Sequence, residues 1–264
     1  MKKYFTIIKT MWGRSLIHRF SIVSYRIGEL VEILFLIVMW TALYREHSVI
    51  SGYTLPEMIT YVLIGNLVSI GTRNFLTDFM SREIRDGALS IFVVKPLTYF
   101  RYVMTRELGR VSIPFLFSLV TQGLIMIVFI RHLILKTTLL HLGLFVVMVA
   151  LAFVLELFMA YLIAMSAFWT DEVDGIFTTI NRLKRFISGG YFPLSLLPAV
   201  YLQVSMALPF AYSFFAPTQL YLGKMSTRQG VLGIGIELAW VGLLYLIIQF
   251  VWRRGTRKYE GVGI

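Results

Sequence analysis

Five ionisable side chains lie inside stretches that are otherwise apolar, and they are the residues best placed to do chemistry in a low-dielectric environment. They are Glu29, Glu32, Arg73, Glu156 and Glu237. A charged group in the hydrocarbon core of a bilayer is costly, so such residues usually pair or face a water-filled pathway for an ion or a substrate. Glu29 and Glu32 share one helix face at i and i+3, and at headgroup level Arg26 or the C-terminal tail could neutralise them.

Glu156 is the sharpest of these cases, because it stands in the middle of a long apolar run. It must be protonated, paired or exposed to a wet cavity. A structural partner such as Arg182 is as consistent with the sequence as a role in substrate passage. We therefore take Arg73, Glu156 and Arg182 as candidate pathway or intramembrane polar residues.

Motifs for catalysis, metal binding and nucleotide binding are missing from the sequence. The chain has no Cys, and its four histidines are scattered without metal-ligand spacing. The segment most similar to a phosphate-binding loop is Gly223-Lys224-Met225-Ser226, which lacks the first glycine of that motif and has Met between Lys and Ser. We expect no catalytic residue, no metal and no cofactor on this chain.

The composition is that of a membrane protein with several spans. Of 264 residues 58% are hydrophobic and 15% are charged, and the mean hydropathy is +0.76. A soluble domain is nearer half apolar and a quarter charged. The net charge of +11 need not indicate nucleic acid, because basic residues of membrane proteins collect on the cytoplasmic side and meet anionic lipid. We expect membrane lipid, and no nucleic acid, among the partners.

The apolar stretches predict one all-α transmembrane domain over residues 1–264 with six transmembrane helices. The spans are expected at about 27–44, 58–75, 111–130, 139–168, 173–191 and 234–252. Residues 1–26 alternate apolar and basic side chains at helical spacing, which is typical of an amphipathic helix in the headgroup layer, although a helix packed on protein is the alternative.

The fifth span is open to two interpretations, because Arg182, Lys184 and Arg185 interrupt it. Hydropathy alone favours a start at Phe186, after these charges. A start at 173 leaves residues 192–222, with their four prolines, as a broken re-entrant region at the outer face.

The distribution of Lys and Arg predicts that both termini are cytoplasmic. Residues 1–26 hold six of these cations, residues 78–110 hold six, and the C-terminal tail holds four. The loops on the opposite side hold five. Cytoplasmic loops carry the excess of positive charge.

One segment on the basic side, at about 81–91, predicts a short amphipathic helix. Ser81 could cap it and Gly87 could end it, while Ile84, Leu89 and Phe92 give it an apolar side. From these residues alone, a socket for a partner protein and a plain interfacial linker are equally consistent.

The order of three motifs resembles type-2 ATP-binding-cassette (ABC) exporter permeases over nearly the whole chain. The first is Ile-Arg-Asp-Gly-Ala-Leu at 84–89 with Lys-Pro-Leu at 95–97, similar to the segment between the second and third spans of that family. The second is Ser-Gly-Gly-Tyr-Phe-Pro at 188–193, and the third is the tail at 252–263. The resemblance favours the early start of the fifth span.

The resemblance implies a non-catalytic transmembrane subunit of an exporter in the plasma membrane, expected to be the bacterial inner membrane. The 81–91 segment would be a coupling helix that docks on a separate ABC ATPase, which carries ATP and Mg. Its contact residues would be Arg82, Glu83, Ile84, Arg85, Asp86, Gly87 and Leu89, with Ile84 and Leu89 filling a groove of the ATPase.

Two ATPase copies and a second permease copy, as a homodimer or a related heterodimer, would complete the transporter, with the pathway along spans one, two and five. Drug, peptide, lipid-linked and glycan cargo all fit this implication. The alternative is a secondary transporter that uses Glu156 and Arg73 as an intramembrane relay, although no inverted repeat is visible.

Overall fold

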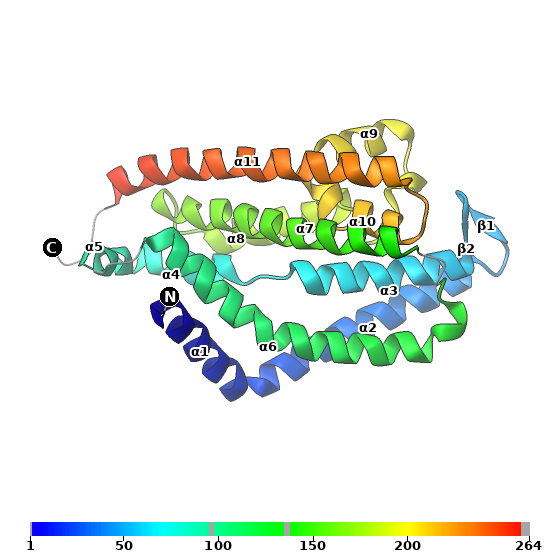
Figure 1. The fold of residues 1–264 in the computed structure, drawn as a ribbon, viewed down its shortest axis with the longest axis horizontal. Coiled ribbons are helices and arrows are strands. Elements are labelled where there is room, and N and C mark those ends of the chain that lie inside the picture. The colour runs from blue at the N-terminus through cyan, green and yellow to red at the C-terminus, as the bar shows by residue number, and fades with distance from the viewer. Residues whose placement is uncertain (1, 95–97, 135–137, 260–264) are drawn as a thin grey trace.

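The computed structural model describes residues 2–94, 98–134 and 138–259, and they form an elongated bundle of helices with one small hairpin (Figure 1). The longer helices are α1 (Lys2–Ile17), α2 (Arg19–Leu43), α3 (Leu55–Thr72), α4 (Leu76–Arg85), α6 (Tyr99–Val128), α7 (Leu139–Met165), α8 (Val173–Ile187) and α11 (Thr227–Lys258). The shorter ones are α5 (Ile91–Val94), α9 (Ala199–Ala207) and α10 (Phe215–Tyr221), with 3-10 turns η1 (Ala88–Ser90), η2 (Ile130–His132), η3 (Ser166–Phe168), η4 (Leu194–Leu196) and η5 (Pro209–Ser213). Strands β1 (Val49–Ile50) and β2 (Tyr53–Thr54) pair antiparallel, with Val49 opposite Thr54 and Ile50 opposite Tyr53.

Within these described ranges, 4 helical segments are long and apolar enough to cross a membrane. They are Leu55–Arg85, Tyr99–Val128, Leu139–Phe168 and Thr227–Lys258. α2 has 25 residues, but Arg26, Glu29 and Glu32 lie within it. The chain is thus an all-α membrane protein, while the predicted number of six spans goes beyond what helix length and composition support.

The predicted fifth helix, 173–191, is shorter than expected. α8 has 15 residues, and Gly189, with φ of +83°, follows its last turn in the left-handed conformation that ends a helix. Fifteen residues rise about 22 Å, which is less than the ~30 Å of a hydrocarbon core. α8 therefore does not span a bilayer by itself. The stretch 192–222 that follows is a series of short helices and turns interrupted at prolines.

The N-terminal region differs from the single interfacial helix predicted for 1–26. α1 ends at Ile17, His18 leaves the helical conformation, and α2 already begins at Arg19. α1 packs on α6, where Gly109 permits a close approach: a Cβ at Gly109 would lie 2.9 Å from Ile8 Cα. This face of α1 is therefore packed on protein, while Phe5 and Leu16 remain exposed.

The predicted second span and coupling helix also have different bounds. α3 ends at Thr72, three residues form a bridge, and α4 runs through Leu76–Arg85. Ser81 is buried inside α4 and is not its cap. Gly87 ends this helical segment as predicted, because it adopts φ of +75°, which glycine tolerates best. The motif at 95–97 and residues 260–263 of the tail motif lie outside the described residues.

The remaining spans agree in position and differ in length. α7 with η3 covers the predicted 139–168, whereas α6 begins at Tyr99 rather than 111, and α11 runs through Thr227–Lys258 rather than 234–252. A capping box at Ser226 and Gln229 starts α11. The extra turns carry polar residues, which hydropathy excludes from a predicted span. They remain helical because a helix can continue beyond the hydrocarbon core.

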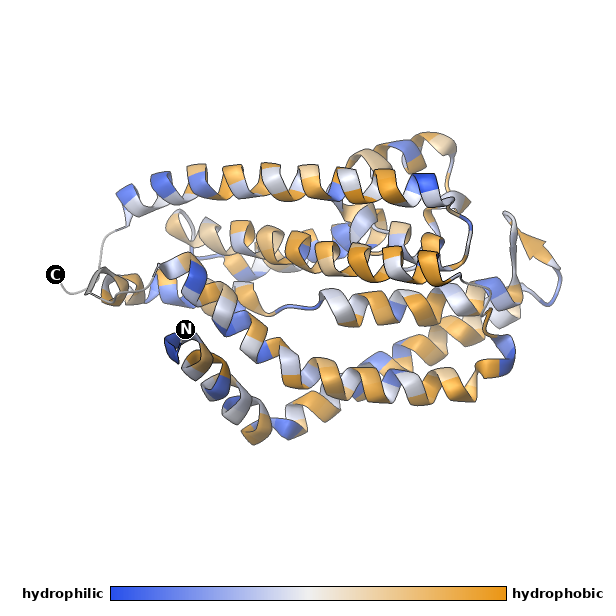
Figure 2. Cartoon of the chain, viewed as in Figure 1, coloured by the Kyte–Doolittle hydropathy of each residue, from blue (hydrophilic) through white to orange (hydrophobic). Residues whose placement is uncertain are grey.

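α7 lies at the centre of the core. Its Met148, Leu155 and Met165 are fully buried in a cluster that includes side chains of α4, α6 and α11. The polar end of the molecule holds α1 and the C-terminal ends of α4 and α11, whereas the middles of α6, α7 and α11 are hydrophobic (Figure 2). Apolar side chains of α6 and α11, such as Val120 and Leu246, are exposed and suit contact with lipid.

Candidate functional site

A polar cavity of about 420 Å³ lies between α2, α3, α7 and α8. Its charged and amide lining comprises Glu29, Glu32, Asn66, Arg73, Asn74, Glu156, Asn181, Lys184 and Arg185. Two of the candidate pathway residues, Arg73 and Glu156, are thus brought together in one cavity. The third, Arg182, is exposed and is not part of this lining.

Helical periodicity explains which side chains of α8 reach the cavity. Asn181, Lys184, Arg185 and Ser188 stand at i, i+3, i+4 and i+7, and all four line it. Arg182 is two residues from Lys184, which is about 200° around a helix. Arg182 and Lys184 therefore point to nearly opposite sides of α8.

Glu156 pairs with Lys184 and not with the predicted Arg182. Lys184 Nζ lies 2.5 Å from Glu156 Oε2, and the Glu156 residue is only 6% exposed. Glu32 pairs with Arg185, the next residue of α8. Two ion pairs therefore hold α8 beside α2 and α7, and each carboxylate of this part of the cavity has a cation from α8.

A second group of charges joins α2 to α3 and α6. Glu29 pairs with Arg73 and, at 2.6 Å, with Arg26, the partner expected from the sequence. The Arg26 guanidinium also donates to Gln122 Oε1 at 2.8 Å and to Thr121 Oγ1 at 2.7 Å. Because Arg26 is 3% exposed, its charge is neutralised and hydrogen-bonded inside the protein, as a buried charge requires.

This arrangement presents charged and hydrogen-bonding groups to one space. Both signs of charge and three amides line the same space, so a polar or charged group could exchange for one partner of an ion pair. Among the described residues, no group of three or more His, Asp or Glu side chains lies close enough to hold a metal ion.

The segment predicted to couple to an ATPase presents a narrower surface than the sequence suggests. Ile84 and Leu89 are buried in this chain's own core, contrary to the expectation that they fill a partner's groove. Glu83 accepts a hydrogen bond from Tyr99 Oη at 2.9 Å and pairs with Arg106. An amphipathic helix must cover its apolar side, and here α6 and α7 provide the cover.

The exposed side chains of this segment are Arg82, Asp86 and Ile91. Arg85 donates to the Asp171 carbonyl at 2.8 Å, and the Leu89 N–H donates to Tyr259 Oη at 3.1 Å. The C-terminal tail motif therefore contacts the segment of the first motif, a connection that the sequence did not reveal.

Sequence reasoning missed that Glu29, Glu32, Lys184 and Arg185 share a cavity. A signal existed for α8, since its polar residues repeat at helical spacing on one face. No comparable signal identified α2 as the opposite wall.

The comparisons with known proteins agree with this architecture. A family model described as ABC-2 family transporter protein matches residues 30–263. No curated protein and no solved structure matches the chain. The match covers most of the 264 residues, including the 81–91 segment and the cavity lining except Tyr25 and Glu29. In members of this family the ATPase is a partner chain. The chain therefore belongs to the ABC-2 family of transporter proteins and is a multi-pass membrane permease subunit of an ABC transporter.

Proposed function

We propose that this chain is the transmembrane subunit of an ATP-driven exporter. Two permease copies, identical or related, would enclose the pathway, and two copies of an ABC ATPase, carrying ATP and Mg, would bind at the cytoplasmic face. Both termini would be cytoplasmic, in the plasma membrane of a bacterium. The observation that carries this proposal is the charged cavity lined by α2, α3, α7 and α8 in a member of the ABC-2 family.

The residues that line the polar cavity would form part of the wall of the transport pathway. Phe35 of α2 and Leu183 and Phe186 of α8 are exposed in the single chain, and a second permease copy facing α2 and α8 would cover them. The charges of both signs favour a cargo with a polar or charged portion, which is compatible with peptide, drug, glycan or lipid-linked cargo.

Coupling would occur through the C-terminal end of α4. Arg82 and Asp86 are exposed there, while the buried face of α4 is joined to α7 by a hydrogen bond from Thr77 Oγ1 to the Ala160 carbonyl at 3.2 Å. A displacement of α4 would therefore move the helix that carries Glu156. The ATPase can drive transport only as far as it binds two permease states with different affinity.

The test is to purify the chain with the ATPase encoded beside it and to measure ATP hydrolysis and cargo transport in proteoliposomes. We expect Arg82→Glu and Asp86→Arg to lower permease-dependent ATP hydrolysis and transport at least tenfold, because each reverses a charge at the proposed contact. The matched control is Arg228→Glu. Arg228 is exposed in the first turn of α11, at the end of the helix bundle opposite the C-terminal end of α4. Unchanged hydrolysis and transport in both α4 variants would contradict the proposed contact.

A secondary transporter that relays ions through Glu156 and Arg73 would transport without an ATPase. Membership of the ABC-2 family favours the ATP-driven mechanism. Transport by the permease alone, driven by an ion gradient, would decide for the alternative.

A further inference from the structure

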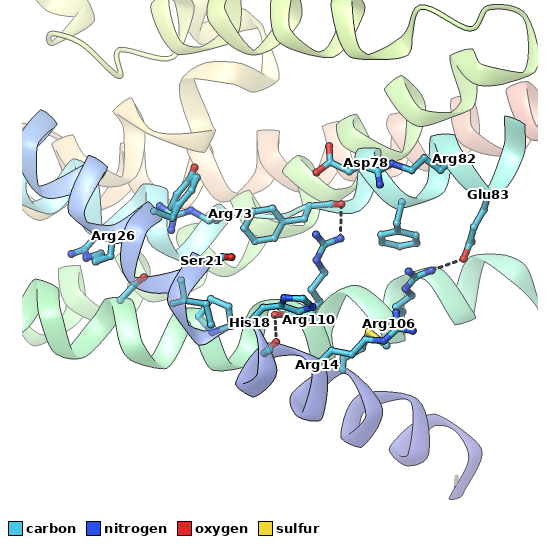
Figure 3. A pocket seen from close by; sticks show the side chains of 18 of the residues that line it. Arg14, His18, Ser21, Arg26, Arg73, Asp78, Arg82, Glu83, Arg106 and Arg110 are labelled. Atoms are coloured by element: carbon cyan, nitrogen blue, oxygen red, sulfur yellow. Dashed lines mark hydrogen bonds and ion pairs between the residues drawn. The ribbon is translucent and has the colours of Figure 1, made fainter. Parts of the chain in front are cut away.

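A second cavity, of about 710 Å³, lies between α1, the first turns of α2, α4 and α6 and shares Tyr25 and Arg73 with the polar cavity (Figure 3). Six arginines line it: Arg14, Arg26, Arg73, Arg82, Arg106 and Arg110. Figure 3 shows Arg106 and Arg110 extending from α6 toward α4, with Arg14 reaching from α1. Neither the pathway nor the exposed end of α4 requires such a concentration of guanidinium groups.

The positive charge of this cavity is only partly neutralised. The lining has six guanidinium groups against three carboxylates, Asp78, Glu83 and Asp86. Glu29 and Glu107 lie behind the lining, and with them included the cations still exceed the carboxylates.

Three of the six arginines are not held in an ion pair among the described residues, although Arg110 Nη1 donates to the Phe75 carbonyl at 3.4 Å. Arg26 and Arg73 pair with Glu29, and Arg106 pairs with Glu83. In the part of the chain that the structure describes, Arg14, Arg82 and Arg110 form no ion pair within 4.0 Å. The lining also contains a donor without a partner, since the buried Nε of Arg106 makes no hydrogen bond there.

Aromatic rings hold several of these guanidinium groups in place. Arg106 lies 3.9 Å from the centroid of the Phe79 ring, and Arg110 lies 4.9 Å from that of Phe75. A guanidinium stacked on a ring keeps its N–H groups free at the edge, where they match the oxygens of a phosphate. The cavity is therefore organised for an anion with several oxygens.

Where α1 meets α2, two residues adjacent in sequence to the cavity lining are apolar and exposed, and we call them the rim. Ile17 is 77% exposed and Phe20 is 80% exposed, and they alternate with His18 and Ser21, which line the cavity. α1 is fixed in this position, since Trp12 Nε1 donates to Ser112 Oγ at 2.6 Å. In a membrane protein, exposed apolar side chains beside a cationic cavity suit the acyl chains and the headgroup of one lipid molecule.

We propose that this cavity binds the phosphate headgroup of an anionic membrane lipid, with Arg14, Arg82 and Arg110 contacting the phosphate and Ile17 and Phe20 contacting the acyl chains. The bound headgroup joins α1, α4 and α6, and so connects lipid occupancy to the end of α4. Binding of a lipid can be measured in the chain without its ATPase or cargo, so a failure here leaves the proposed export function untouched.

The experiment measures binding of short-chain phosphatidic acid to the purified full chain in detergent, by native mass spectrometry and by titration calorimetry. Phosphatidylcholine of the same chain length and inorganic phosphate are the other two ligands. We expect phosphatidic acid to bind at least tenfold more tightly than either, because the cavity selects a doubly charged phosphate and the rim selects acyl chains. Arg14→Gln and Arg82→Gln, both at exposed positions, should each weaken binding about tenfold through loss of a charge-assisted hydrogen bond.

Two further variants separate the site from general charge and from folding. Ser21→Trp keeps every arginine but fills the cavity, and it should reduce binding at least tenfold. Arg257→Gln removes an exposed arginine from the last turn of α11 and should leave the affinity unchanged. Equal losses of affinity in Arg14→Gln and Arg257→Gln would contradict the proposed binding site. Inorganic phosphate binding as tightly as phosphatidic acid would show that the site recognises free phosphate and not a lipid headgroup.

Discussion

Replacing Lys184 with methionine should destabilise the chain far more than the same change at Arg182, although the two residues share one turn of α8. Lys184 is the partner of Glu156 at 2.5 Å, and the Glu156 side chain is 8% exposed. Removing one member of a buried pair typically costs about 3 to 5 kcal/mol, because the other charge is left without a partner. The Lys184 side chain is 22% exposed beside a cavity that can admit water, so we expect a loss of about 2 to 3 kcal/mol.

The assay is equilibrium unfolding of the purified chain in mixed detergent micelles, followed by tryptophan fluorescence. Arg182→Met should change the free energy of unfolding by less than about 0.5 kcal/mol, as exposed substitutions usually do. The double variant Glu156→Met with Lys184→Met should regain most of the loss, because an apolar pair needs no counter-charge. The difference between the double variant and the sum of the single variants gives the coupling of the pair. Equal losses at positions 182 and 184, or strictly additive single losses, would refute this reasoning.

Two further substitutions test how α1 and α2 are held. Gly109→Ala should loosen α1 and accelerate proteolysis of the N-terminal region, since the new Cβ would meet the backbone of α1 at 2.9 Å. Gly123→Ala in the same helix is the control, because its Cβ would enter open space and should slow unfolding slightly. Similar rates of proteolysis in the two variants would argue against the close approach of α1 and α6. Arg26→Leu should cost about 3 kcal/mol in free energy of unfolding, because it removes the donor to the Oε1 atom of the fully buried Gln122 and one of the two cations that pair with Glu29. The exposed Arg19→Leu is its control, and an equal loss in both would show that Arg26 has no special structural role.

Local signals in the sequence were sufficient for the elements that depend on one stretch of chain. The long apolar run around Met148 and Leu155 predicted α7 almost to the residue, because a helix in lipid must satisfy its own backbone hydrogen bonds. Gly87 ended α4 as expected, since the left-handed conformation is a property of the residue itself. The order of motifs along the chain was likewise enough to indicate the family.

Tertiary packing decided the contacts between stretches. Helical spacing puts Arg182 and Lys184 on different faces of α8, but only the rotation of α8 against α7 determines which face meets Glu156. The sequence has no glycine or proline at the elbow at His18, so the break between α1 and α2 follows from the packing of α1 on α6.

The two cavities illustrate the same division. The amphipathic pattern of 81–91 established that Ile84 and Leu89 need cover, and the folded chain supplied it from within rather than from a partner. Each cavity draws its lining from four helices, and some of these are far apart in sequence, such as α2 and α6 in one cavity and α2 and α8 in the other. The residue types, spacing and total charge are properties of the sequence, whereas the meeting of opposite charges in one cavity and the gathering of six arginines in the other depend on distances that exist only after the helices have packed.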